Sequence, residues 1–136
     1  MDVKGAYLNG ILKETVYMHQ PKGFADGTDQ VCKLIKMLYG LKQSSWGWNV
    51  EFDRKVKVRG FILSHVDPCV YMHSQDKGMT IVTIWVDDLL IFTSTDEAMQ
   101  NIKQDLWSEW EITDMGEPMK IVGIKIAQSP GTISIS

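Results

Sequence analysis

The sequence has little cysteine, little excess charge of either sign and no long apolar run. Among its 136 residues the only cysteines are Cys32 and Cys69, and no Asn-x-Ser/Thr glycosylation site occurs. This argues against a disulfide-stabilised secreted scaffold, so we expect an intracellular, cytoplasmic protein. The apolar run from Met79 to Phe92 is interrupted by Asp87 and Asp88. A membrane-spanning helix needs about 18 uninterrupted apolar residues, so we expect no association with a membrane.

The charge balance excludes one class of nucleic-acid binder. Lys and Arg total 14 against 17 Asp and Glu, which gives a net charge of −3. Proteins that hold nucleic acid by bulk electrostatics carry a large positive charge, so any such role here must rest on local sites. The hydrophobic content of 44% and charged content of 23% are typical of a globular protein. We therefore expect a single folded domain over residues 1–136.

Two amphipathic helices are predicted by apolar residues that recur every three or four positions. The first lies between Gly40 and Gly60, with Ser44 or Ser45 as its cap, and the second follows a capping box at residues 94–97. The apolar positions of the two helices are Trp48, Phe52 and Val56, then Met99, Ile102, Leu106 and Trp110.

Short β-branched and aromatic runs predict strands. We expect a short helix in Ala6–Leu12 and strands at Thr15–His19, Val31–Lys36, Phe61–Ser64, Val70–His73, Met79–Val86, Leu89–Thr93, Lys120–Ala127 and Ile133–Ser136. This order indicates an α+β fold, an antiparallel sheet with the two main helices on one face.

Asp87 and Asp88 separate two strongly apolar strands and are expected to form the turn of a hairpin. Neighbouring residues of a regular strand point to opposite faces, but at a tight turn two carboxylates can share one site. Such carboxylates repel each other unless a cation lies between them, and hard oxygen ligands suit Mg²⁺. The alternative is structural, because Asp is a common turn former that tolerates the required backbone angles.

A third carboxylate, Asp2, begins a segment that carries a family resemblance. Met1–Gly10, Leu38–Gln43, Trp85–Asp88 and Asp114–Glu117 together resemble motifs of the reverse transcriptases of copia-type LTR retrotransposons. The resemblance covers essentially the whole chain. It implies a polymerase palm-like fold and an RNA-directed DNA polymerase that acts by two-metal nucleotidyl transfer.

The resemblance also assigns roles to individual residues. It implies that Asp2, Asp87 and Asp88 are the catalytic residues and the ligands of two Mg²⁺ ions, which Mn²⁺ can replace. It further implies substrate-binding roles for four residues, namely Tyr7 beside the nucleotide sugar, Gly40 and Gln43 beside nucleotide and template, and Trp85 beside the primer end. The implied partners are an RNA template, a DNA primer, deoxynucleoside triphosphates and the remainder of a retrotransposon polyprotein.

Two departures from the family pattern favour an alternative. Ser44-Ser45-Trp46 stands where the family commonly has Ala-Pro-Arg, and Trp85 replaces the usual Tyr. We expect a truncated palm-type domain, with fingers before Met1 and thumb and ribonuclease H regions after Ser136, and with Asp2 on a weakly held strand. The alternative function is a catalytically inactive fragment or relic that acts at most as a weak binding module. An unrelated Mg²⁺-dependent phosphatase-like site is a third reading, but no nucleophile or base near Asp2 is evident.

Overall fold

The central hairpin of the protein buries every second side chain of its first strand. In the computed structural model, which describes residues 1–75 and 78–136, this hairpin joins β6 (Gly78–Trp85) to β7 (Asp88–Thr93). Thr80, Val82 and Ile84 are buried, whereas the residues between them are partly exposed. Because successive side chains of a strand point to opposite faces, this period of two gives the sheet one core face and one wetter face.

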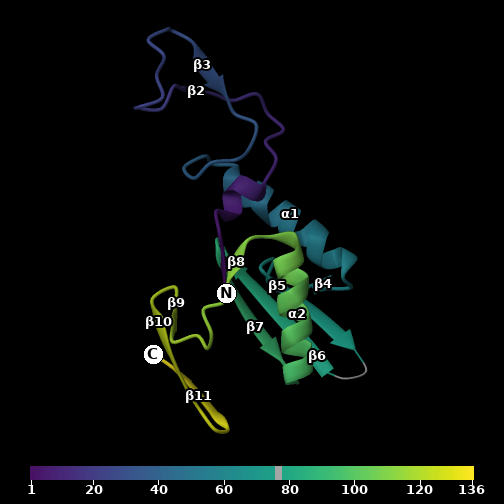
Figure 1. The fold of residues 1–136 in the computed structure, drawn as a ribbon. Helices are drawn as coiled ribbons and strands as arrows, with labels where there is room; N and C mark the ends of the chain where they lie inside the picture. The colour runs from purple at the N-terminus through teal and green to yellow at the C-terminus, as the bar shows by residue number, and fades with distance from the viewer. Residues whose placement is uncertain (76–77) are drawn as a thin grey trace.

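Six strands form the main sheet in the order β4-β5-β6-β7-β1-β8, with antiparallel pairing throughout. The remaining strands of this sheet are β1 (Asp2–Val3), β4 (Ile62–Leu63), β5 (Val70–Gln75) and β8 (Ile112–Thr113). Two smaller sheets pair β2 (Tyr17–His19) with β3 (Val31–Lys33), and β10 (Ile124–Ser129) with both β9 (Lys120–Ile121) and β11 (Thr132–Ile135). The β2–β3 ribbon extends away from the main sheet (Figure 1).

Two α-helices cover the core of the main sheet. They are α1 (Ser44–Val58) and α2 (Asp96–Glu109), and both contribute to one apolar cluster with the sheet. At its centre the Trp48 ring of α1 meets the Trp110 ring, which directly follows α2, edge to face with centroids 5.4 Å apart. The predicted α+β class, with helices and antiparallel strands, is thereby confirmed.

The two helix starts differ from the sequence prediction. Gln43 precedes α1 without a side-chain cap, and the Ser44 hydroxyl instead donates to the Leu38 carbonyl oxygen at 2.6 Å. At α2 the cap is Thr95, whose side chain accepts from the Ala98 N–H at 3.2 Å. The Ser94 hydroxyl accepts the Met79 N–H and ties the helix start to the sheet. Each serine hydroxyl therefore hydrogen-bonds a neighbouring segment of the chain instead of capping its helix.

Two further elements were predicted too long. The expected helix over Ala6–Leu12 is a 3-10 turn, η1 (Ala6–Asn9), because Gly10 adopts an extended backbone. The expected single strand at Lys120–Ala127 is a tight hairpin, since Val122 and Gly123 take φ angles of 48° and 86°. Among the described residues, neither α-helix combines the length and apolar character needed to cross a membrane.

The expectation of a weakly held strand at Asp2 was wrong. β1 lies between β7 and β8, so both of its edges are paired. Asp2 is opposite Asp88 on one side and Thr113 on the other. The N–H groups of Val3 and Lys4 also donate to the carbonyl oxygens of Asp87 and Glu111, at 2.7 and 2.9 Å. β1 is only two residues long, and it is stabilised by pairing with β7 and β8 on both edges.

An ion cluster joins the C-terminal ends of α1 and α2. Glu109 accepts from Arg59 at 2.5 Å and pairs with Lys55, and its side chain is only 17% exposed. Hydrogen bonds from Lys55 and Arg59 hold the pKa of Glu109 below its ordinary value of 4.5. A carboxylate with a lowered pKa stabilises the fold above its unfolded pKa, and this contribution is lost as the pH falls through the folded pKa.

We expect Glu109→Gln to lower the free energy of unfolding by about 1–2 kcal/mol at pH 7. The difference from the parent chain should shrink as the pH falls through the lowered pKa of Glu109, where the folded chain takes up this proton. Urea denaturation followed by circular dichroism at several pH values measures it. Glu14→Gln, at an exposed position outside the cluster, is the matched control and should leave stability within about 0.5 kcal/mol. Equal pH profiles for parent and Glu109→Gln would contradict this account.

Candidate functional site

The register between β1 and β7 brings two acidic residues face to face. Asp2 is the cross-strand partner of Asp88. The flanking hydrogen bonds run from the Leu89 N–H to the Met1 carbonyl and from the Val3 N–H to the Asp87 carbonyl. Asp2 and Asp88 are therefore a non-hydrogen-bonded pair, in which Cα atoms are about 4.5 Å apart and the side chains share one face. Two like charges so placed repel each other.

The turn of the hairpin lies one residue earlier than the sequence suggested. Its two residues are Val86 and Asp87, whereas Asp88 belongs to β7 and pairs with Trp85. The prediction that Asp87 and Asp88 together form the turn was wrong, because pairing with β1 extends β7 back to Asp88. As a result, Asp87 is positioned by the turn, whereas Asp88 is positioned by strand pairing with Trp85 and Asp2.

The turn itself is strained and is anchored from the core. Val86 has φ = 54°, and Asp87 has no positive φ, a pattern typical of a type II′ turn, in which Gly is preferred at the first position. A β-branched residue in this region carries a steric cost. The Val86 carbonyl accepts a 2.7 Å hydrogen bond from the indole Nε1 of the buried Trp48. The core of α1 thus fixes the turn that carries Asp87.

Asp87 is bound by a residue that the sequence analysis did not single out. The hydroxyl of Tyr39 donates to the Asp87 carboxylate and lies 2.9 and 2.8 Å from its two oxygens. Burial, followed by the hydrogen bond to Asp87 and that residue's charge, raises the pKa of Tyr39 to about 12, so the phenol keeps its proton. The Tyr39 ring packs on Tyr7, with centroids 4.6 Å apart. No local spacing could indicate this contact, because 48 positions separate Tyr39 from Asp87.

The predicted substrate residues lie around this aromatic pair and the hairpin. Gly40 directly follows Tyr39, is exposed and takes φ = 94°, a conformation that favours glycine. Gln43, half-buried, ends the same turn and precedes α1. Trp85 ends β6 opposite Asp88, with 57% of its surface exposed. The fold therefore brings Tyr7 close to Asp87 through Tyr39, and Trp85 beside Asp88.

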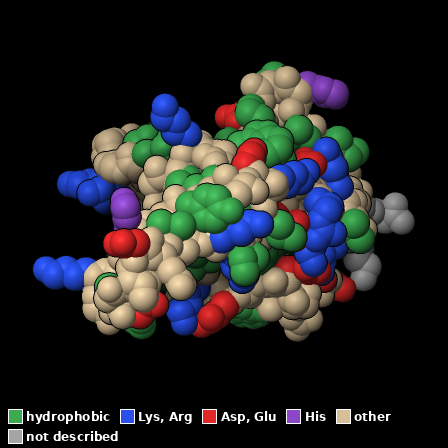
Figure 2. Space-filling model, turned by 90° about the horizontal axis from the view of Figure 1, so that it is seen from above, with side chains coloured by type: hydrophobic (Ala, Val, Ile, Leu, Met, Phe, Trp, Pro, Cys, Tyr) green, Lys and Arg blue, Asp and Glu red, His purple; other side chains and the backbone are tan. Residues whose placement is uncertain are grey.

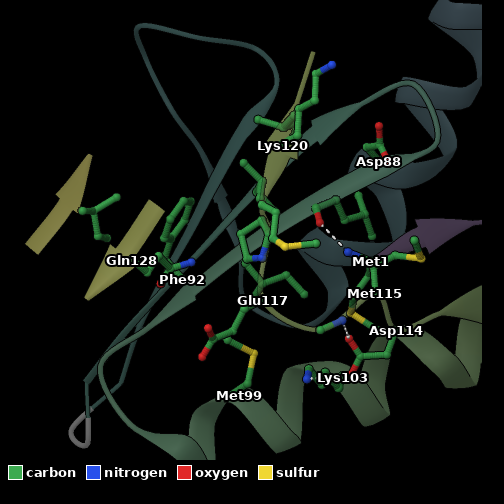
Figure 3. A pocket seen from close by; sticks show the side chains of 18 residues that line it. Met1, Asp88, Phe92, Met99, Lys103, Asp114, Met115, Glu117, Lys120 and Gln128 are labelled. Carbon is green, nitrogen blue, oxygen red and sulfur yellow. Dashed lines mark hydrogen bonds and ion pairs between the residues drawn. The ribbon is translucent and has the colours of Figure 1, made fainter. Parts of the chain in front are cut away.

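A cavity of about 670 Å³ opens beside Asp88. Its walls are β7, one side of α2 and the 114–121 segment, with contributions from β10 and β11 (Figure 3). Lys103 and Asp114 form a 2.7 Å ion pair in it, and the Lys103 hydrogen bond is the main cause that lowers the pKa of Asp114. Asp88 therefore lies at the rim of a mostly apolar hollow.

Of the three predicted metal ligands, two are arranged to share a divalent cation and the third is not. Mg²⁺ takes oxygen ligands and is often held by one or two carboxylates, with water and phosphate completing its shell. Asp2 and Asp88 provide such a pair on one face. The side chains of the described residues nevertheless form no group of three His, Cys, Asp or Glu that could hold a metal ion. Asp87, the third member, faces the Tyr39 phenol.

The surface seen in Figure 2 carries charged side chains of both signs. On the face seen in Figure 2, basic and acidic side chains are interspersed with exposed hydrophobic ones. This mixture matches the net charge of −3. Contacts with a polyanion would accordingly depend on individual positions and not on a uniform basic field.

The sequence profile of the reverse transcriptase (RNA-dependent DNA polymerase) family matches residues 1–136. The chain is 38% identical over 131 residues to the Retrovirus-related Pol polyprotein from transposon TNT 1-94 of Nicotiana tabacum, covering 94% of this chain and 10% of the polyprotein. It is 33% identical over 139 residues to the putative transposon Ty5-1 protein of Saccharomyces cerevisiae, covering 100% of this chain and 45% of that protein.

A third relative is the Retrovirus-related Pol polyprotein from transposon RE1 of Arabidopsis thaliana, 33% identical over 138 residues. That alignment covers 100% of this chain and 9% of the polyprotein. The chain therefore spans about a tenth of the length of the two Pol polyproteins and under half of the yeast protein. No solved structure matches it.

The strain at Val86 leads to a stability prediction. We expect Val86→Gly to raise the free energy of unfolding by about 1 kcal/mol, because the relief of steric strain exceeds the entropy cost of an added glycine. Thermal unfolding should shift upward by roughly 3 °C for a domain of this size. Val66→Gly, at an exposed position without positive φ, is the matched control and should destabilise slightly. A loss of stability in Val86→Gly equal to that of the control would show that the turn is unstrained.

Proposed function

Because this chain belongs to the reverse transcriptase family of copia-type retrotransposons, we propose that it is the palm-type catalytic portion of an RNA-directed DNA polymerase. The observation that carries the proposal is the register that sets Asp2 against Asp88, with Asp87 next to them in a strained and anchored turn. Its substrates would be an RNA template, a DNA primer and deoxynucleoside triphosphates.

The three carboxylates have the chemistry that nucleotidyl transfer requires from protein. This reaction depends on positioning and charge neutralisation more than on covalent participation of side chains. Asp2, Asp87 and Asp88 would hold two Mg²⁺ or Mn²⁺ ions, which when bound activate the primer 3′-hydroxyl and neutralise the leaving pyrophosphate. Asp2 and Asp88 contribute from a rigid ladder, and Asp87 contributes from the turn fixed by Trp48.

The surrounding residues would bind the substrates. The half-buried Tyr7, backed by Tyr39, would lie against the nucleotide sugar and exclude a 2′-hydroxyl. Gly40 and Gln43 would border nucleotide and template, where the absence of a Cβ at Gly40 permits close approach. Trp85 would contact the primer end beside its cross-strand partner Asp88.

The remaining binding surfaces would come from the rest of a polyprotein. The matched Pol polyproteins are about ten times as long as the region they share with this chain. With a net charge of −3, the domain would not bind a nucleic-acid backbone by bulk electrostatics. We therefore place it as one catalytic portion of a larger polymerase.

Primer extension tests the proposal. In a chimera, this chain replaces the matching segment of the tobacco relative, and DNA synthesis on an RNA template is measured with Mg²⁺. Asp87→Asn should lower the rate by at least about 10²-fold, because it removes one of three charges that would hold the ions. Asp29→Asn, in the exposed loop between β2 and β3, should leave synthesis unchanged. An active chimera that tolerates Asp87→Asn contradicts the assignment.

The alternative is a catalytically inactive domain that acts as a weak binding module. It is favoured by one observation, the lack of a converged three-carboxylate group among the described residues. The same assay distinguishes the two. A correctly folded chimera without synthesis, in which Trp85→Tyr also fails to restore activity, would support the inactive domain.

Tyr7 gives a prediction on sugar selection. We expect Tyr7→Ala to raise incorporation of ribonucleotides relative to deoxynucleotides by about tenfold, because a smaller side chain admits the 2′-hydroxyl. Competition between the two nucleotide types in the chimera measures this ratio. Tyr17→Ala, on the exposed β2–β3 ribbon, serves as the control. An unchanged ratio in Tyr7→Ala would assign Tyr7 a packing role only.

A further inference from the structure

We propose that Tyr39 is a latch that holds the Asp87 carboxylate away from Asp2 and Asp88 and must release it before a divalent cation is bound by all three. This inference rests on the proposed metal site. It concerns a residue outside the set that the resemblance assigned, and it makes Tyr39 a positioning residue rather than a catalytic one.

The hydrogen-bond geometry is the first argument. One phenolic O–H lies 2.9 Å from one carboxylate oxygen of Asp87 and 2.8 Å from the other. Each carboxylate oxygen directs one of its two lone pairs toward the space between the oxygens, and the phenol occupies that shared side of Asp87. A cation that approaches Asp87 from this side must displace the Tyr39 hydroxyl.

The charges of the site explain why such a latch is useful. Asp2 and Asp88 already face each other as like charges across a ladder. A third carboxylate brought among them would add repulsion while no cation is bound. The Tyr39 hydrogen bond stabilises Asp87 apart from the pair, in agreement with the absence of a three-carboxylate group among the described residues. A bound cation reverses the balance and favours the converged arrangement.

Tyr39 combines a fixed backbone with a half-exposed side chain, which allows it both to bind the Asp87 carboxylate and to release it. Its backbone is fixed, since the Ser44 hydroxyl binds the Leu38 carbonyl at 2.6 Å and Gly40 closes the turn with φ = 94°. Its ring rests on Tyr7 at a centroid distance of 4.6 Å. Half of the residue's surface is nevertheless exposed and Tyr39 lies outside the buried core cluster, so rotation of the side chain into solvent would cost the contact with Tyr7 but no core residue its place.

Binding of Mn²⁺ to the 136-residue chain tests the latch without any activity measurement. Electron paramagnetic resonance counts free Mn²⁺ during titration of the parent chain, Tyr39→Phe and the control Tyr17→Phe. Tyr39→Phe removes only the hydroxyl and should tighten binding by about three- to tenfold, since no hydrogen bond then competes with the cation. Tyr17→Phe should bind like the parent chain. Equal or weaker binding by Tyr39→Phe overturns the proposal, because a supporting or purely structural role predicts one of these results.

Two further variants separate failure of the latch from failure of the metal site. If Asp2→Asn and Asp88→Asn weaken Mn²⁺ binding but Tyr39→Phe leaves it unchanged, the metal site stands and the latch is refuted. If neither Asn substitution alters binding, the metal site is refuted and the latch with it. Tightening by Tyr39→Phe that disappears when Asp87→Asn is added supports both.

A spectroscopic measurement on the unmutated chain gives an independent test. With 3-fluorotyrosine in place of tyrosine, the ¹⁹F resonance of each ring is assigned from the four Tyr→Phe variants. Diamagnetic Mg²⁺ should shift the resonance of residue 39 and leave that of residue 17 in place. A resonance of residue 39 that does not move at saturating Mg²⁺ overturns the latch.

Discussion

The site depends on the pairing of a two-residue strand with the central hairpin. β1 lies between β7 and β8, and this position alone brings Asp2 to Asp88 across 86 positions of sequence. The pairing has an electrostatic cost, since it holds two carboxylates on one face. That cost is offset by the burial of Val3, which is fully enclosed by the core on the opposite face of β1. The hydrophobic effect thereby holds together an acidic arrangement that would otherwise separate.

The hairpin turn that carries Asp87 is fixed in place by a residue of the buried core. Val86 stays in an unfavourable conformation because the surrounding structure determines it, through the ladder on either side and the indole hydrogen bond beneath. Trp48 takes part both in the aromatic cluster with Phe52 and Trp110 and in the hydrogen bond to the turn. Stability of the fold and placement of Asp87 therefore share one side chain.

Local patterns predicted much of the fold and some of the site. The four-residue period of Trp48, Phe52 and Val56 located α1, and the apolar runs around the acidic pair located the hairpin. Patterns of this kind carry no information on pairing between distant segments, so the extension of β7 to Asp88 could not be foreseen. The same reason explains why Tyr39 was missed, since its contact with Asp87 depends on how the chain before α1 folds back onto the hairpin. The serines predicted as helix caps were also misassigned, because a hydroxyl near a helix start can form its hydrogen bond with a neighbouring segment instead.

The double role of Trp48 affects how sequence variation in this domain should be interpreted. A buried aromatic residue in a helix is ordinarily classed as part of the scaffold, and changes there are attributed to lost folding. Here the indole N–H reaches the backbone beside an acidic group, so a conservative aromatic replacement can preserve the packed interior and still free the turn. Loss of this one indole N–H would thus release the turn that carries Asp87 while the overall shape of the domain is retained.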